Sequence, residues 1–533
     1  MIRACYTCRR RHIQCDRSGI PCAKCQKAGL ECLDKRPVRW VQGVAIRGVM
    51  RGRTFENSSI SATPVGKIDM RPSPLSDSSS NTDAQHQAKP LIPLRGLSAL
   101  LEASDMTGPT RPALPSVPLP MNDTALTALD STARYYLDYC MWTLTEDDEN
   151  SYSFLDNDRI CQLFIVYDSQ SNPFRNLIPL ALNDTVLLDS LLGLAARHRA
   201  NFDHPFTMLE TQQFPLSGKP HHEALRYKHR AIQGLAEALN GQKAYQDTTV
   251  ATVFLLVFLD LLESGCDKWN HHLEGAKSLM ALTPSQDPGR TVQRLRHFIT
   301  KQIHLIEALG ATFVRPHLLT QSNSIDEARD LLEDVVEESF LGCPEYILTS
   351  LQFLSIQRDV IAHGNVFDQA LLSDVLSVLH GITEFDCRFW ASSLRQQSTM
   401  HNIDDLTKLA RTYQLGAQLY GQRVVDALQN TQTVQDSVVS ELIELVDQLK
   451  VGSTLLKCIL WPITVAGLEC QEPSQRSILI SLLETFWIST HCLNVMNAAK
   501  ILNAHWTKVD ENKSVATHWI FDIGRLRHDW LLI

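Results

Sequence analysis

Residues 5–32 read CYTCRRRHIQCDRSGIPCAKCQKAGLEC and hold six cysteines. Each half of this segment has the framework C-x2-C-x6-C, and a further six residues separate the two halves. The cysteines are Cys5, Cys8, Cys15, Cys22, Cys25 and Cys32. Because ligand residues repeat within one short segment, the pattern predicts a site for two metal ions.

The cysteine count suits zinc. Zn²⁺ prefers four ligands in a tetrahedron and binds thiolates well. Two separate tetrahedral sites would need eight ligands, but the six cysteines suffice if two thiolates each bridge both metals. Nearby Lys and Arg would offset the negative charge of such a cluster and favour the thiolate form. We therefore predict two Zn²⁺ ions per chain, bound by these six cysteines.

A disulfide knot is the alternative for six closely spaced cysteines. The chain starts MIRACYTC and shows no apolar signal segment, so we expect a reducing compartment. Paired C-x2-C units in such a compartment favour metal binding.

Charge is unevenly divided along the chain. Residues 1–53 carry 13 Lys and Arg against 3 Asp and Glu, a net charge of +10, whereas the whole chain carries −9, which leaves −19 for residues 54–533. A small basic region on an acidic chain is typical of nucleic-acid binding. The basic run Arg9, Arg10, Arg11 and His12 follows Cys8, so we expect the first half of the segment to meet DNA.

The cysteine segment resembles the fungal-type Zn2Cys6 binuclear cluster of transcription factors in all six positions and all five spacings. The resemblance implies that Cys5 and Cys22 are the bridging ligands. It also implies that the helix after Cys8 enters the major groove and reads a CGG-like triplet. The family places two basic residues, usually lysines, where this chain has Arg11 and His12. Arg11 can bind guanine O6 and N7 together, whereas His12 departs from the pattern and is mostly neutral at pH 7.

Two further segments separate the cysteines from the rest of the chain. Residues 35–54 form a basic linker, in which Lys35, Arg36 and Arg39 would contact phosphates, serve in nuclear import, or both. This region lacks sustained heptads, so DNA binding as a monomer or as a homodimer formed through the body stays open. Residues 55–123 are rich in Ser and Pro, and we predict a disordered linker.

Residues 124–533, the body, show long apolar runs with helical spacing and no set of alternating strands. Residues 248–264 are apolar nearly all round and predict a central buried helix. This helix is too short to span a bilayer and is interrupted by Asp260 and Glu263. Residues 436–450 predict an amphipathic helix, and residues 223–240 another. The apolar face expected in 223–240 consists of Leu225, Ile232, Leu235 and Leu239. The predicted fold is mainly α, with a large all-α regulatory domain.

Parts of the body resemble the fungal-specific transcription factor domain. The pieces that carry the resemblance are FIVYDSQSNPFRNLIPLAL (164–182), SLLGLAARHRANF (190–202), HHLEGAKSLMAL (271–282), WPITVAGLEC (461–470) and DWLLI (529–533). The resemblance implies a helical domain that modulates activity through partners or small molecules, and it supplies no catalytic site.

The body contains no P-loop, nucleophile-elbow or H-E-x-x-H motif, so we expect no enzyme. Two sets of residues could bind metal. The first is His222, Glu223 and His229, and the second is His271, His272 and Glu274. Histidines in such places more often have ordinary hydrogen-bond partners. The run 197–199, Arg-His-Arg, would place positive charge at a helix C-terminus, where it suits the dipole. We expect the aromatic residues Trp269, Phe389 and Trp390 to lie in the core.

These observations predict a zinc-dependent, sequence-specific DNA-binding regulator of RNA polymerase II transcription in the nucleus. Its partners would be double-stranded DNA and the transcription machinery or co-regulators, with no membrane. We place its boundaries at 1–34 for the cluster, 35–54 and 55–123 for the linkers, and 124–533 for the regulatory domain. A thiolate-based metal or redox sensor is the alternative, and a helical enzyme with a zinc-binding appendage is a third.

Overall fold

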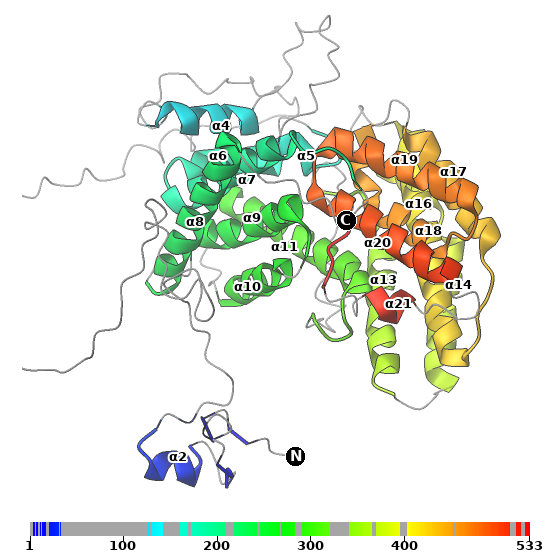
Figure 1. Ribbon diagram of the computed structural model, residues 1–533, viewed down its shortest axis with the longest axis horizontal. Coiled ribbons are helices and arrows are strands. Elements are labelled where there is room, and N and C mark those ends of the chain that lie inside the picture. The colour runs from blue at the N-terminus through cyan, green and yellow to red at the C-terminus, as the bar shows by residue number, and fades with distance from the viewer. Residues whose placement is uncertain are drawn as a thin grey trace, which may run out of the picture. The chain divides into compact units, whose positions relative to one another are not determined.

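The computed structural model divides the chain into two compact units, Met1–Thr110 and Arg111–Ile533 (Figure 1). The described residues are 4–5, 7–8, 11, 13–16, 21–30, 32, 126, 129–141, 160–168, 172–207, 218–241, 246–266, 268–282, 290–319, 340–364, 369–394, 402–450, 454–511, 519–523 and 528–533. Across these ranges the elements are helices, with one isolated bridge and no named strand. The prediction of a mainly α fold is therefore confirmed.

The predicted basic linker, 35–54, and the predicted disordered linker, 55–123, both lie outside the described residues. In the first unit, the described part contains a helical turn at 7–8 and the short helix α2 (Ala23–Lys27).

The second unit is built from helices that follow one another along the chain. Its first half contains α4 (Ser131–Met141), α5 (Ile160–Leu163), α6 (Pro173–Ala181), α7 (Thr185–Asn201), α8 (Lys219–Leu239), α9 (Asp247–Glu263), α10 (Trp269–Leu282), α11 (Arg290–Gly310) and η4 (Ala311–Phe313). Its second half contains α13 (Glu345–Ala362), α14 (Gln369–Glu384), α15 (Cys387–Leu394), α16 (Ile403–Gln429), α17 (Asp436–Lys450), η6 (Thr454–Cys458), α18 (Leu460–Glu469), α19 (Pro473–Thr490), α20 (Leu493–Glu511) and α21 (Trp519–Asp522).

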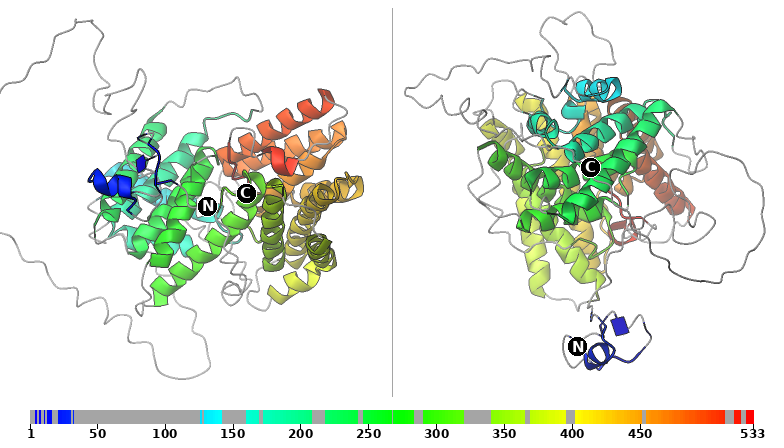
Figure 2. Two further views of the ribbon diagram at one scale, coloured as in Figure 1. Left: turned by 90° about the horizontal axis from the view of Figure 1, so that it is seen from below. Right: turned by 90° about the vertical axis from the view of Figure 1, so that its left-hand side faces the viewer.

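Two helices organise this unit, and one hydrophobic core runs through it. Helix α9 is buried on all its faces and contacts α7, α8 and α10, as the sequence predicts for residues 248–264. Helix α16, 27 residues long, contacts α13, α14, α15, α17 and α18. Figures 1 and 2 show the green helices α7 to α11 on one side of the unit and the yellow and orange helices on the other.

Residues 528–533 lie against both halves of the second unit. The Leu531 N–H donates to the Gly265 carbonyl at 2.7 Å, and a bridge joins Cys266 to Trp530. On the other side, the Asn494 side chain on α20 donates to the Ile533 carbonyl at 3.0 Å. Since Leu531 is fully buried, this segment is part of the core.

Helix α8 forms where residues 223–240 predict a helix, but the face that it buries differs from the predicted one. Leu225 is 46% exposed and Leu239 is 39% exposed, against the prediction that both lie on the buried face. The buried residues are Ala224, Tyr227, Ala231 and Leu235. A side chain added at Gly193 of α7 would lie 3.5 Å from the Tyr227 Cβ. Helices α7 and α8 therefore approach closely at small residues, and this contact decides which face of α8 is buried.

Trp269 and Trp390 lie in the core, as predicted, but Phe389 is 72% exposed and the prediction for it is wrong. Helix α15 has eight residues and turns one face to α16, so two adjacent aromatic residues cannot both face inward. Among the described helices, none has both the length and the apolar character of a membrane span.

Candidate metal centre

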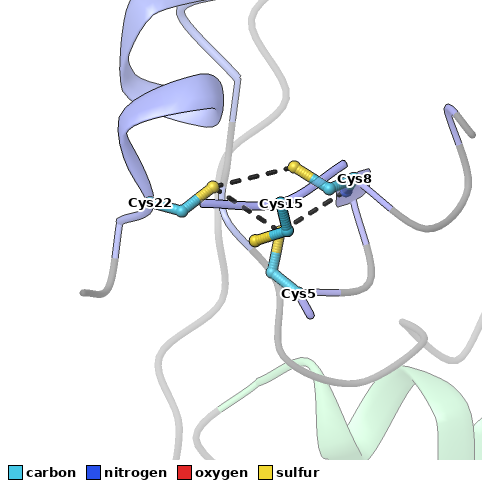
Figure 3. A group of neighbouring side chains, drawn as sticks. All are labelled: Cys5, Cys8, Cys15 and Cys22. Atoms are coloured by element: carbon cyan, nitrogen blue, oxygen red, sulfur yellow. Dashed lines mark hydrogen bonds between the residues drawn. The ribbon is translucent and has the colours of Figure 1, made fainter. Parts of the chain in front are cut away.

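The six cysteines of residues 5–32 gather into two groups of four sulfur atoms. The groups are Cys5, Cys8, Cys15 and Cys22, and Cys5, Cys22, Cys25 and Cys32. Within each group all Sγ atoms lie within 4.8 Å of one another. Figure 3 shows the side chains of the first group converging from separate segments of the chain. Cys5 and Cys22 belong to both groups, which suits the bridging role that the family resemblance implies for them.

The sulfur spacing fits tetrahedral zinc. With Zn–S bonds of about 2.3 Å, the edge of a tetrahedron of sulfurs is about 3.8 Å. The Cys5 and Cys22 Sγ atoms lie 3.8 Å apart, and the Cys22 Sγ lies 3.7 Å from the Cys8 Sγ. The Cys5 Sγ lies 3.7 Å from the Cys25 Sγ. Six clustered cysteines are thus consistent with a binuclear zinc cluster, the two Zn²⁺ ions predicted from the sequence.

In the first half of the cysteine segment, the chain turns after Cys8. The Arg11 N–H donates to the Thr7 carbonyl at 3.3 Å and to the Cys8 carbonyl at 3.1 Å. The Ile13 N–H then donates to the same Cys8 carbonyl at 3.2 Å. These bonds form a short helical turn that ends before the third cysteine.

The second half repeats this pattern at an offset of 17 residues. The Ala28 N–H donates to the Lys24 carbonyl at 3.3 Å and to the Cys25 carbonyl at 3.1 Å, and the Leu30 N–H donates to the Cys25 carbonyl at 3.0 Å. Gly29, with φ of +60°, makes the left-handed turn that ends α2. The sequence repeat is therefore accompanied by a repeat of these backbone hydrogen bonds.

Backbone N–H groups donate to the sulfurs and favour thiolates. The Cys8 N–H donates to the Cys5 Sγ at 3.4 Å and lowers the pKa of the Cys5 thiol. Likewise, the Cys25 N–H lowers the pKa of the Cys22 thiol. Burial raises the pKa of Cys8, and it raises that of Cys25 to about 12. These two buried thiols depend on a metal ion to be thiolates at neutral pH, and Zn²⁺ supplies that charge when it is bound.

Asp16 is a residue of the site that the sequence reasoning missed. Its carboxylate accepts the Ala23 N–H at 3.0 Å and the Lys24 N–H at 3.2 Å, at the start of α2. Capping rules examine the residue just before a helix, which here is Cys22. Asp16 lies six positions further back, so no local sequence signal identifies it.

Among the residues predicted to contact DNA, Arg11 is described, and it is exposed on the turn that follows Cys8. The others lie outside the described residues: Arg9, Arg10, His12, Lys35, Arg36 and Arg39.

The histidine clusters of the second unit have ordinary partners. His222 Nδ1 lies 2.8 Å from the Gly218 carbonyl, and His272 Nδ1 lies 2.8 Å from the Asp260 carboxylate. Over the described part of the chain, the groups that could hold a metal ion consist of cysteines alone.

The sequence predicts positive charge at the end of α7, but His198 in this run is neutral. It is buried, its Nε2 lies 3.0 Å from the Thr490 carbonyl, and its Nδ1 lies 2.7 Å from the Tyr139 hydroxyl. Since a carbonyl only accepts, Nε2 carries the proton, and Nδ1 accepts from the hydroxyl. Burial lowers the pKa of His198 to about 3, so this ring is neutral and joins three helices.

Several thiols of the second unit are poor candidates for redox chemistry. Burial raises the pKa of Cys161, Cys458 and Cys492 to about 12, and it raises that of Cys140 well above its ordinary value. Because the thiolate is the reactive form, these residues act as small apolar side chains.

Each of the two units contains a match to a known protein family. Residues 3–40 match the family described as Fungal Zn(2)-Cys(6) binuclear cluster domain, and residues 154–533 match the Fungal specific transcription factor domain. The acriflavine sensitivity control protein acr-2 of Neurospora crassa is 22% identical over 549 residues, which cover 91% of this chain and 88% of that protein. No solved structure matches the chain.

The second match spans more than half of the chain, and the first coincides with the sulfur groups. This evidence points to a regulator of transcription and not to an enzyme. The chain belongs to the fungal DNA-binding transcription factors in which a zinc cluster precedes a fungal specific transcription factor domain.

Proposed function

We propose that this protein is a zinc-dependent regulator of RNA polymerase II genes, acts in the nucleus and recognises a CGG-like triplet in double-stranded DNA. The observation that carries the proposal is the pair of four-sulfur groups that share Cys5 and Cys22. This geometry accounts for six cysteines with two metal ions and supports a folded DNA-reading module.

Each cysteine has a place in the proposed cluster. Cys8 and Cys15 would complete one tetrahedron, and Cys25 and Cys32 the other, with Cys5 and Cys22 common to both. Bound zinc supplies positive charge and holds the two halves together. The protein itself supplies the N–H donors that stabilise the sulfurs, including the Cys22 N–H, which lies 3.3 Å from the Cys32 Sγ.

DNA recognition would come from the first half. Its basic residues follow Cys8, whereas the matching positions of the second half are Gln26, Lys27, Ala28 and Gly29. Arg11 is exposed, so its guanidinium can approach guanine O6 and N7. The neighbouring Arg9, Arg10 and His12 would contact phosphates or base edges, and the basic residues Lys35, Arg36 and Arg39 would follow the backbone.

The second unit would set the activity of the DNA-bound protein. We propose boundaries at 1–34 for the cluster, 35–54 and 55–123 for the linkers, and 124–533 for the regulatory domain. Its large helical surface would bind the transcription machinery or co-regulators, and the protein would bind DNA either as a monomer or as a homodimer formed through this unit. This division assigns recognition of DNA to one unit and control to the other.

The test is selection of bound DNA from a random pool by the full chain loaded with zinc. We expect a CGG-like motif to be enriched, to disappear with a zinc chelator and to return when zinc is restored. The matched control is Cys22→Ser, which should select no motif. If the wild-type chain holds two zinc ions and still selects none, the thiolate sensor becomes the better explanation.

A further inference from the structure

The start of α2 has all its backbone donors occupied, and two of them donate to a residue six positions before the N-cap residue Cys22. The Ala23 and Lys24 N–H groups donate to the two carboxylate oxygens of Asp16, at 3.0 and 3.2 Å. The Gln26 N–H donates to the Cys22 carbonyl at 3.0 Å. The remaining first-turn donor, the Cys25 N–H, donates to the Cys22 Sγ.

Cys22 caps the helix only in part, because its Sγ accepts the Cys25 N–H but its side chain has no oxygen for the Ala23 and Lys24 N–H groups. An N-cap side chain such as Ser or Asp accepts N–H groups of the first turn with its oxygen. The Cys22 thiol instead belongs to both sulfur groups, so its position is set by metal binding. Acceptors for the Ala23 and Lys24 N–H groups must therefore come from elsewhere in the chain, and Asp16 provides two oxygens.

Asp16 places a negative charge in a region that is otherwise strongly basic. Residues 1–53 carry only 3 acidic residues, and the phosphates of bound DNA would repel a carboxylate near them. Six thiolates with two Zn²⁺ are also negative overall, so neither DNA nor the cluster favours Asp16. The N-terminus of a helix does favour a carboxylate, because its N–H groups point outward and carry partial positive charge.

The contact also joins two parts of the cluster. Asp16 directly follows Cys15, and α2 directly follows Cys22, while Cys15 and Cys22 share a four-sulfur group. The two hydrogen bonds thus close the loop between the third and fourth cysteines at the separation that this group requires. We propose that Asp16 is a positioning residue for the metal cluster, which holds Cys15 against the start of α2 and raises the affinity of the protein for zinc.

The test measures zinc retention, and it rests on the proposed function only in taking zinc as the metal. The full chain, loaded with zinc, is titrated with a chelator, and the zinc that remains per chain is measured. We expect Asp16→Ala to lose half its zinc at a chelator concentration about tenfold lower than the wild type, as is usual for partners that orient metal ligands. Asp16→Asn keeps one of the two oxygen acceptors, so it should lose half its zinc at a chelator concentration between those of Asp16→Ala and the wild type.

Two results would overturn the inference. One is equal zinc retention by Asp16→Ala and the wild type. The other is an equal loss in Asp16→Ala and Asp16→Asn, which would make the charge important and not the accepted hydrogen bonds. Asp34→Ala is the control for removing one acidic residue from the same region, and it should retain zinc like the wild type.

DNA binding separates this inference from the proposed function. With excess zinc, Asp16→Ala should regain the DNA affinity of the wild type, because the cluster is then filled. If the wild type holds zinc in the expected Asp16-dependent way but selects no DNA, the proposed function fails and the positioning role of Asp16 stands.

Discussion

Cys5 and Cys22 are 17 residues apart in the chain, yet their Sγ atoms lie 3.8 Å apart, and each belongs to both groups of four sulfurs. Their places correspond in the two halves of the repeat, since each is the first cysteine of its half. The repeat thus brings equivalent residues together at its centre, and the other four cysteines lie around them.

Removal of a shared sulfur should disturb both metal ions. We expect Cys22→Ser to retain less than one zinc per chain, because a structural zinc site depends on a full set of ligands. Cys32→Ser removes a sulfur from one group and should retain about one zinc per chain. Zinc measured by mass spectrometry of the native chain decides this, with Cys266→Ser in the second unit as the control. Equal zinc content in Cys22→Ser and Cys32→Ser would contradict shared ligation.

Arg11→Ala should change the choice of base as well as the affinity. A bidentate contact with guanine is worth about 1–3 kcal/mol of discrimination at that position. Binding to a set of DNA sites with single substitutions would show a loss confined to one guanine. A uniform loss across all sites would instead assign Arg11 to a phosphate.

Gly265→Ala should destabilise the second unit by about 3 kcal/mol, from left-handed backbone strain and overpacking together. Gly265 has φ of +64°, and an added Cβ would lie 2.7 Å from the Asn494 Cβ and 2.8 Å from the Leu531 carbonyl oxygen. Gly364 is a matched control, because its φ is +74° and nothing lies within 4 Å of an added Cβ. Gly364→Ala should cost about 1 kcal/mol, from backbone strain alone. Urea unfolding of both variants measures the difference, and equal losses would contradict the close approach.

Leu531→Ala should lower the free energy of unfolding by about 2–5 kcal/mol, because the side chain is fully buried and its loss leaves a cavity. Leu282 is 62% exposed at the end of α10, so Leu282→Ala should change stability by less than about 0.5 kcal/mol. Thermal unfolding of the two variants compares the same chemical change at a buried and an exposed site. A small effect at Leu531 would show that residues 528–533 contribute little to the core.

The neutral His198 predicts loss of stability in acid. Its pKa falls from 6.5 to about 3 on folding, so below pH 6.5 the unfolded chain binds a proton that the folded chain does not. The free energy of unfolding should therefore decrease as the pH falls from 6.5 toward 3, by up to about 1.4 kcal/mol per pH unit from this group.

His198→Gln isolates that contribution. Glutamine can accept from Tyr139 and donate to Thr490, but it does not titrate. Urea unfolding between pH 7.5 and 4.5 should show a shallower dependence on pH in the variant than in the wild type. Identical slopes would mean that His198 is protonated in the folded protein.

The cluster could be predicted from the sequence because metal geometry dictates ligand number and spacing. The repeat of C-x2-C-x6-C led to two zinc ions, and the two sulfur groups agree. Asp16 could not be predicted, because its bonds to Ala23 and Lys24 depend on the path of the chain between the third and fourth cysteines.

In the second unit, periodicity identified helices but not always their buried faces. Helix α9 was predictable, since a helix apolar on every side has to be buried. The buried face of α8 depends on the small residues that let α7 approach, and hydrophobicity alone favoured Leu225. His198 was expected to be charged, but helices distant in sequence bury it and provide its two hydrogen-bond partners.

The docking of residues 528–533 has a consequence for how the protein is made. The Trp269 indole donates to the Asp529 carbonyl at 3.1 Å across 260 positions of sequence. On a ribosome, helices α4 to α20 are synthesised before this partner exists, so the core around Trp269 cannot be completed until residues 528–533 have been made. Until then, the surface around Trp269 and Gly265 stays open to solvent or to a chaperone. We therefore expect a chain truncated before residue 529 to lack the contacts that cover Trp269 and Gly265.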